Sequence, residues 1–120
     1  MNAPFQSVDH VQLAMPPSRE DSARAFYSAL LGMAEIPKPA DANDRRGCWF
    51  ASGDVQIHLG VEEDFRPARK AHPALRCADY DALLERLRKH GTAVREDDRS
   101  AQRRAYIDDP FGNRIELIAL

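Results

Sequence analysis

The chain has 120 residues, 43% of them hydrophobic and 30% charged, a balance that fits one globular domain over residues 1–120. Its net charge of -2 excludes the strong basic excess of most nucleic-acid-binding proteins, and no apolar run approaches the ~18 residues of a membrane-spanning helix. The first residues lack the pattern of a secretory signal, and two distant cysteines, Cys48 and Cys77, do not suggest a disulfide framework. We therefore expect a cytoplasmic protein that binds neither nucleic acid nor membrane.

The first predicted element is a β-strand near the N-terminus. Val11, Leu13 and Met15 alternate with His10 and Gln12, which is the two-residue period of a strand with one buried face. Two consecutive prolines end this strand. The alternation places the histidine and the glutamine on the face opposite the apolar residues.

A helix, a loop and a hairpin are predicted next. Ser18 is a candidate N-cap for a helix from about Arg19 to Leu31, and Gly32 is a candidate C-terminal cap. Residues 37–46 are polar and aperiodic, which is typical of a loop. The apolar runs on either side of a Ser-Gly-Asp turn within residues 48–59 predict a hairpin.

The second half repeats this order after a charged connector at residues 60–70. Asp79 is a candidate cap for its helix, which Gly91 would end. The predicted strands of this half cover residues 72–77, 92–94, 103–108 and 114–118.

This internal repeat predicts an α+β fold of two βαβββ modules, approximately residues 6–60 and 71–120. The modules would form a curved mixed sheet, shaped as a cup, with the helices outside. His10 and His72 fall in the first strand of each module, and His58 and Glu116 fall in the last. The alternative is that the repeat is a coincidence, because small α+β domains often alternate strands and helices in this way. A residue of a type that binds metals, at the matching position of four strands, argues against this alternative.

The two helices should pack on the apolar faces of the strands. The opposite faces, which carry these four residues, are rich in polar side chains. Burying polar groups without partners costs about 1–3 kcal/mol each, so a wet, metal-binding pocket is expected. Three imidazoles and one carboxylate suit a divalent transition metal: Zn, Fe, Ni, Co or Mn. The other residues on these faces are candidate substrate-binding groups, with structural hydrogen bonding as the alternative for each: Gln12, Gln56, Arg76, Tyr106 and Arg114.

The chain resembles the vicinal oxygen chelate superfamily, which includes glyoxalase I, fosfomycin-resistance thiol transferases, extradiol dioxygenases and bleomycin-resistance proteins. The resemblance covers nearly the whole chain. It is most specific at Asp109-Pro110-Phe111-Gly112-Asn113-Arg114-Ile115-Glu116, and weaker at 9–13, 25–33 and 71–75. It implies the metal ligands His10, His58, His72 and Glu116, and a homodimer. Glyoxalases usually have a carboxylate where this chain has His58, so the reaction type stays open.

The leading expectation is a metal-dependent lyase, transferase or dioxygenase whose small-molecule substrate is chelated through oxygen atoms. His10, His72 and Glu116 would be the firm ligands, with Glu116 and His58 as catalytic residues. His58 would be either the fourth ligand or a base. The alternatives are a protein of the same fold that binds and sequesters a drug or metabolite, and a structural or regulatory domain.

Overall fold

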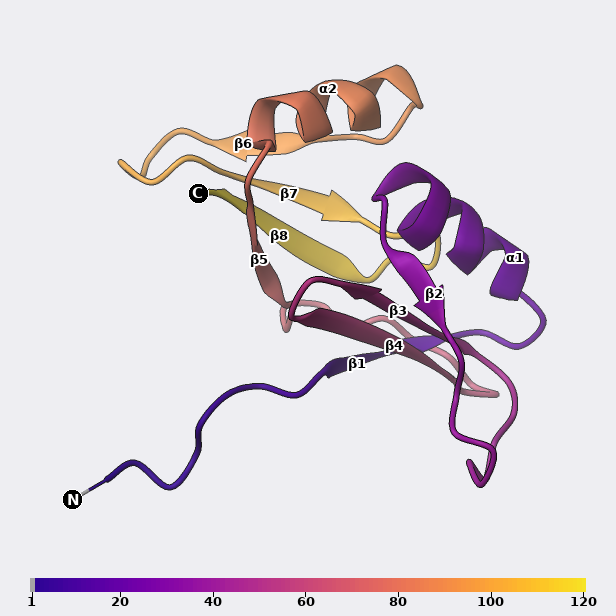
Figure 1. The fold of residues 1–120 in the computed structure, drawn as a ribbon. Helices are drawn as coiled ribbons and strands as arrows, with labels where there is room; N and C mark the ends of the chain where they lie inside the picture. Colours follow the sequence, from indigo (N-terminus) through magenta and orange to yellow (C-terminus); the bar gives the residue numbers. More distant parts are fainter. Residues whose placement is uncertain (1) are drawn as a thin grey trace.

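A computed structural model describes residues 2–120, which form two four-stranded sheets with helices packed against them (Figure 1). The first sheet has the order β1 (Val11–Met15), β4 (Val55–Val61), β3 (Cys48–Ser52) and β2 (Ala34–Ile36). The second has the order β5 (Ala74–Cys77), β8 (Arg114–Ala119), β7 (Arg104–Asp108) and β6 (Arg95–Asp97). The α+β prediction and its two βαβββ modules are confirmed.

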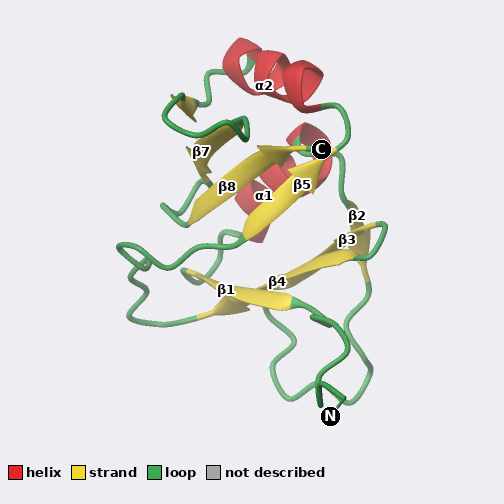
Figure 2. Cartoon of the chain, turned by 90° about the vertical axis from the view of Figure 1, so that its left-hand side faces the viewer, coloured by secondary structure: helices red, strands yellow, loops and turns green. Residues whose placement is uncertain are grey.

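The two sheets repeat one pairing pattern, seen one above the other in Figure 2. In each, the first strand of the module pairs in parallel with the last, as in Val11 opposite Ile57 and Ala74 opposite Glu116. Antiparallel pairs join the remaining strands. Each sheet is therefore mixed, as the repeat in the sequence predicts.

Three strand predictions need correction. The three-residue strand β2 was not predicted, because it is too short to show a period. The strand expected at residues 92–94 is displaced to β6, at Arg95–Asp97. His10 and His72 lie just before β1 and β5 rather than within them. Pro73 follows His72 and cannot donate a ladder hydrogen bond, so the strand begins after it.

The first helix begins as α1 (Glu20–Ala23) and continues as the π-helical segment η1 (Arg24–Leu30). The predicted cap at Ser18 is wrong: this residue adopts φ 65°, and the N-cap position belongs to Arg19, without a side-chain cap bond. The C-terminal prediction is confirmed, since Gly32 has φ 78° and leaves the helix in the left-handed conformation.

The second helix, α2 (Tyr80–Lys89), covers the second module (Figure 1). Asp79 occupies its N-cap position as predicted, but its backbone carbonyl, rather than its side chain, accepts a hydrogen bond from the Leu83 N–H. Gly91 follows the helix with φ 84°. No helix in the described part of the chain is long and apolar enough to cross a membrane.

One buried carboxylate links the two modules. Asp109, in the turn before β8, accepts a hydrogen bond from the Tyr27 hydroxyl at 2.6 Å, and others from the backbone N–H groups of Phe111 and Asn113. The Asn113 amide donates to the same carboxylate and to the Ala14 carbonyl. The turn of the second module is thus bonded to both the helix and the first strand of the first module.

Candidate metal centre

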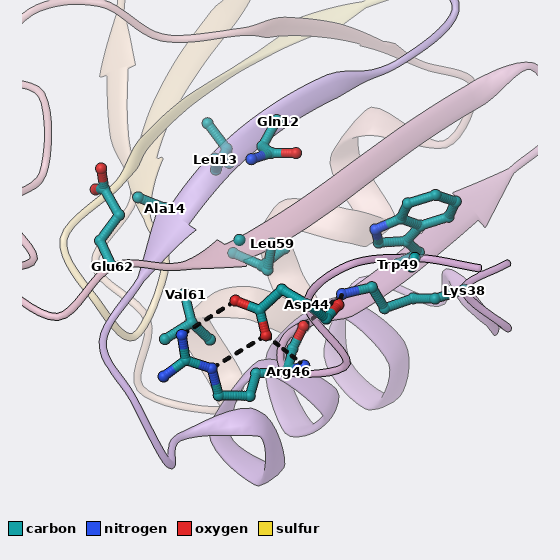
Figure 3. A pocket seen from close by; sticks show the side chains of 12 residues that line it. Gln12, Leu13, Ala14, Lys38, Asp44, Arg46, Trp49, Leu59, Val61 and Glu62 are labelled. Atoms are coloured by element: carbon teal, nitrogen blue, oxygen red, sulfur yellow. Dashed lines mark hydrogen bonds and ion pairs between the residues drawn. The ribbon is translucent and has the colours of Figure 1, made fainter. Parts of the chain in front are cut away.

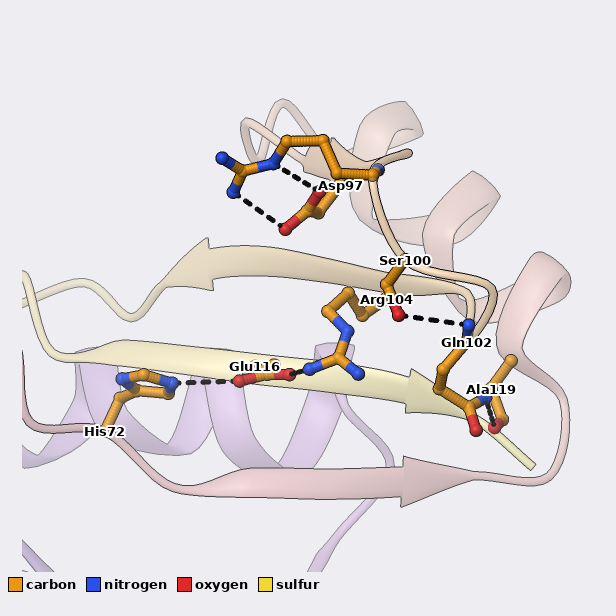
Figure 4. A network of polar contacts seen from close by, with 8 residues as sticks. His72, Asp97, Ser100, Gln102, Arg104, Glu116 and Ala119 are labelled. Carbon is orange, nitrogen blue, oxygen red and sulfur yellow. Dashed lines mark hydrogen bonds and ion pairs between the residues drawn. The ribbon is translucent and has the colours of Figure 1, made fainter.

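A histidine and two charged residues meet on the polar face of the second sheet (Figure 4). His72 Nε2 lies 2.9 Å from Glu116 Oε1, and Arg104 Nη1 donates to Glu116 Oε2 at 2.8 Å. The Glu116 side chain is only 7% exposed. This carboxylate is therefore buried and contacted on both oxygens, which is how a charged group is made tolerable inside a protein.

The orientation of His72 makes this pair a good fit for a divalent cation. Its Nδ1 lies 2.7 Å from the Lys70 carbonyl oxygen, which can only accept, so Nδ1 carries a proton. In the neutral ring, Nε2 then directs a lone pair at the Glu116 carboxylate, and two acceptors face each other. A proton or a cation must lie between them. Metal-ligating histidines commonly donate their other N–H to a backbone carbonyl, as here.

The spacing of the pair is also suitable. Bonds of about 2.0–2.2 Å from a metal to nitrogen and oxygen place neighbouring ligands about 3 Å apart. His72 Nε2 and Glu116 Oε1 are separated by 2.9 Å. The residues therefore fit the group that the sequence predicts at this position.

The first sheet holds its histidines in a stack of three rings. His58 lies between Trp49, with ring centroids 3.8 Å apart, and His10, with centroids 4.1 Å apart. Its Nε2 donates to Gln56 Oε1 at 3.0 Å. Burial, followed by the neighbouring charge of His10, lowers the pKa of His58. The imidazole is therefore held in its neutral form near pH 7.

The four predicted ligands do not form one cluster within a single chain. Among residues 2–120, no three His, Cys, Asp or Glu side chains are placed to hold one ion. His10 and His58 contact each other on the first sheet, while His72 and Glu116 contact each other on the second. The expectation of a common hollow in one chain is thus not met, because no strand pairing joins the described sheets.

The predicted substrate-binding residues accompany these two pairs. Gln56 bonds to His58, and the Tyr106 ring lies edge-on to His72 with centroids 5.6 Å apart. The Arg114 guanidinium lies over the same Tyr106 ring, 5.9 Å from its centroid. Arg76 is exposed on β5, in register with Ile118 of β8.

Gln12 lines a cavity of about 430 Å³ beside the first sheet (Figure 3). Trp49 forms part of the wall, and the loop at residues 37–46 contributes Lys38, Asp44 and Arg46. Arg46 forms an ion pair with Asp44 at 3.1 Å. The cavity thus combines an aromatic surface with polar and charged groups next to the histidine stack.

Arg104 is the site residue that sequence reasoning missed. The sequence nevertheless contained the information that places Arg104 on the polar face. Arg104 and Tyr106 are two residues apart on one strand, so they share a face. Across from them, Glu116 is in register with Tyr106, which brings the carboxylate within reach of Arg104.

Comparison with known proteins places this geometry in a family. Residues 7–117 match the model of the Glyoxalase/Bleomycin resistance protein/Dioxygenase superfamily. The chain belongs to this superfamily. A glyoxalase family protein from Bacillus anthracis, known from a crystal structure, is 46% identical in sequence to this chain. The two structures superpose with a TM-score of 0.94, over 99% of this chain and 98% of that chain.

Other members of the glyoxalase superfamily differ in what they do. Glutathione transferase FosA of Serratia marcescens is 27% identical over 94% of this chain and 80% of its own length. A 3-dehydroshikimate dehydratase of Pseudomonas aeruginosa is 29% identical over 89% of this chain, which spans only 20% of that enzyme. TnmS3, an antibiotic-binding protein from Streptomyces sp. CB03234, is 26% identical with a TM-score of 0.73, over 96% of this chain and 98% of that chain. The superfamily therefore includes both enzymes and binding proteins.

Proposed function

We propose that this member of the glyoxalase superfamily is a metal-dependent enzyme acting on a small molecule that binds through its oxygen atoms. His72 and Glu116 of one copy would hold the ion together with His10 of a second copy. The observation that carries the proposal is the His72–Glu116 contact: Nε2 and Oε1 lie 2.9 Å apart, and the Lys70 carbonyl fixes the ring with Nε2 towards the carboxylate.

A homodimer is part of this proposal, because His10 does not reach the second sheet of its own chain. The segment leading to His10 supports a partner. Phe5 and Val8 are 86% and 72% exposed, although both are apolar, and the segment extends away from the sheets (Figure 1). A second copy whose second module faced the first module would complete the site and cover these side chains.

The chemistry of the site follows from its neighbours. A divalent cation, when bound, supplies a Lewis acid that stabilises negative charge on a substrate oxygen. The Lys70 carbonyl fixes the His72 ring, and the Tyr106 ring restricts its movement. His58, held neutral by burial, is available to accept a proton or to serve as a fourth ligand, and both roles stay predictions. The amide groups of Gln12 and Gln56 would orient the substrate.

Metal titration of the chelator-treated protein tests the ligand assignment. Calorimetry with Zn²⁺ and Mn²⁺ should show that His72→Ala and Glu116→Gln each weaken binding by about 100-fold or more, since each removes a direct ligand. His90→Ala is the matched control, because His90 lies at the end of α2 and bonds to the Arg86 carbonyl. Unchanged affinity in both ligand variants would overturn the metal site.

A mixed dimer tests the sharing of ligands between copies. His10→Ala and Glu116→Gln homodimers would each lack a ligand in both sites. After unfolding and refolding together, each mixed dimer would regain one intact site, with His10 from one copy and Glu116 from the other. Restored metal binding would support the shared site, whereas no recovery would overturn the sharing of His10 and Glu116 between copies.

Sequestration of a small molecule without chemistry is the second candidate. The cavity of about 430 Å³ beside Trp49 and the likeness to the antibiotic-binding protein TnmS3 favour it. Metal binding discriminates the two candidates: a protein that binds aromatic small molecules tightly, and binds no transition metal, would favour sequestration.

A further inference from the structure

Three arginines lie on the same face of the second sheet as Glu116, and one of them, Arg104, contacts it. Arg104 and Arg76 occupy positions on either side of Ile118 in the same row of the sheet, and Arg114 is two residues before Glu116 on β8. Neither Arg76 nor Arg114 forms an ion pair with another described residue. Among the described residues, Arg104 forms its ion pair with Glu116, while Asp97 and Asp108 lie opposite Arg104 and Arg114 on the neighbouring strands.

The other acidic residues on this face are paired elsewhere. Asp97 accepts from Arg99 at 3.0 Å, and Asp108 lies 3.4 Å from Arg95. The surroundings of Glu116 therefore keep an excess of positive charge in the protein itself. A divalent cation at His72 and Glu116 would increase that excess. An anion is the natural complement to such a surface.

The donors of Arg104 give this charge a specific geometry. One donor, Nη1, is used by Glu116. Its Nε is buried and has no hydrogen-bond partner among the described residues. Leaving a buried donor unpaired costs about 1–3 kcal/mol. Because Nε and Nη2 point along one edge of the planar guanidinium, they form a fork that matches two oxygens of a carboxylate or phosphate.

We propose that Arg104, assisted by Arg76 and Arg114, binds an oxyanion group of the substrate. The substrate class is then a small molecule that carries a carboxylate, phosphonate or phosphate close to the oxygen that binds the ion. This inference rests on the proposed function, which places the substrate oxygen that binds the ion at His72 and Glu116. The oxyanion subsite itself is built only from the arginines of the second sheet, and an anion enters it by a small movement of the Arg104 side chain away from its buried position.

Binding of matched small probes tests the subsite. Lactate and propane-1,2-diol share a hydroxyl and differ in the carboxylate, and phosphonoacetate carries two oxyanion groups. In titrations followed by NMR, phosphonoacetate and lactate should bind the metal-loaded protein, and propane-1,2-diol should bind at least about 10-fold more weakly, as expected for the loss of a charge-assisted hydrogen bond. Equal affinity for lactate and propane-1,2-diol would overturn the inference.

Variants of Arg104 separate this inference from the metal site. Arg104→Gln should weaken phosphonoacetate binding about 10-fold or more, and Arg104→Lys, which keeps the charge but loses the fork, should weaken it to a smaller extent. Arg104→Gln should leave Zn²⁺ affinity unchanged or tighter, because Glu116 loses a competing partner. Arg104→Lys, which keeps that ion pair, should leave Zn²⁺ affinity unchanged. Arg103→Gln is the matched control, since Arg103 pairs with Asp81 away from Glu116.

The outcomes are distinguishable. Metal binding with no effect of Arg104 substitution on phosphonoacetate would overturn the oxyanion subsite and leave the metal site standing. Arginine-dependent binding of phosphonoacetate in a protein that takes up no metal would support the subsite and overturn the metal-dependent function. Arg104→Lys also guards against misfolding of Arg104→Gln, because it keeps the ion pair with Glu116.

Discussion

The two modules share one fold but surround their matching residues with different groups. His58 on β4 and Glu116 on β8 occupy equivalent positions in the repeat. His58 lies between the rings of Trp49 and His10 and is held uncharged. Glu116 lies between His72 and Arg104 in a charged network. The same position is thus packed by aromatic rings in one module and by ionic partners in the other.

This difference shows which part of the structure sets the chemistry. The sheet register fixes where each residue sits, with Trp49 opposite His58 and Tyr106 opposite Glu116. The residues on neighbouring strands then decide whether the position holds a charge. A repeated fold therefore does not imply two equivalent halves of a site. Each half is expected to respond differently to substitution, salt and pH.

The largest predicted effect lies where the two modules are joined. Asp109→Ala removes the acceptor of the Tyr27, Phe111 and Asn113 groups and should lower the free energy of unfolding by about 3 kcal/mol. Urea denaturation measures it. Its neighbour Asp108 is exposed and pairs only with Arg95, so Asp108→Ala should cost about 1 kcal/mol or less. Equal effects would mean that the buried turn does not hold the modules together.

The next effect is on the salt dependence of stability, which should differ between Glu116 in the second module and His58 in the first. In chelator-treated protein, Glu116→Gln should lower the free energy of unfolding by about 1–2 kcal/mol at low salt, because it removes the partner of a partly exposed arginine. Raising the salt concentration should reduce this difference. The change His58→Gln should show no salt dependence. A salt-dependent effect in His58→Gln and none in Glu116→Gln would reverse the comparison.

The smallest effect is on the pH dependence of stability. Burial lowers the pKa of His58 in the folded protein, whereas the unfolded chain has the usual value of about 6.5. The unfolded state therefore binds the proton more readily, and stability is full above about pH 6.5 and falls as the pH drops towards the folded pKa. Denaturation of metal-free protein at pH 7.5, 6.5 and 5.5 should show this fall. In His58→Gln the slope should be smaller, and an identical slope would contradict the lowered pKa.

The sequence predicted the repeat because alternation and turn residues are local signals. Gly32 and Gly91 ended helices as expected, and the residues of the polar faces were identified from the two-residue period. The N-cap prediction failed at Ser18 because this residue adopts a left-handed conformation, with φ 65°, which residue-type preferences alone do not reveal. The short strand β2 carries too few residues for a period to appear.

The candidate site was predicted in part for a related reason. Strand alternation, from which we expected His10, His58, His72 and Glu116 to meet in one hollow, identifies only the polar face of each strand. It does not tell how two sheets are placed in space, so the separation of the pairs within one chain could not be foreseen. Arg104 was missed because its role depends on contact with Glu116, which only the pairing of β7 with β8 reveals.

The bond between Tyr27 and Asp109 has a consequence for the order of folding. In the described chain every strand pairs within its own module, so each sheet can form from one contiguous half at a limited cost in loop-closure entropy. The Tyr27 hydroxyl, however, finds its acceptor only after residues near the C-terminus have been made. A chain growing from its N-terminus must therefore leave the first helix without this bond until the second module has been made.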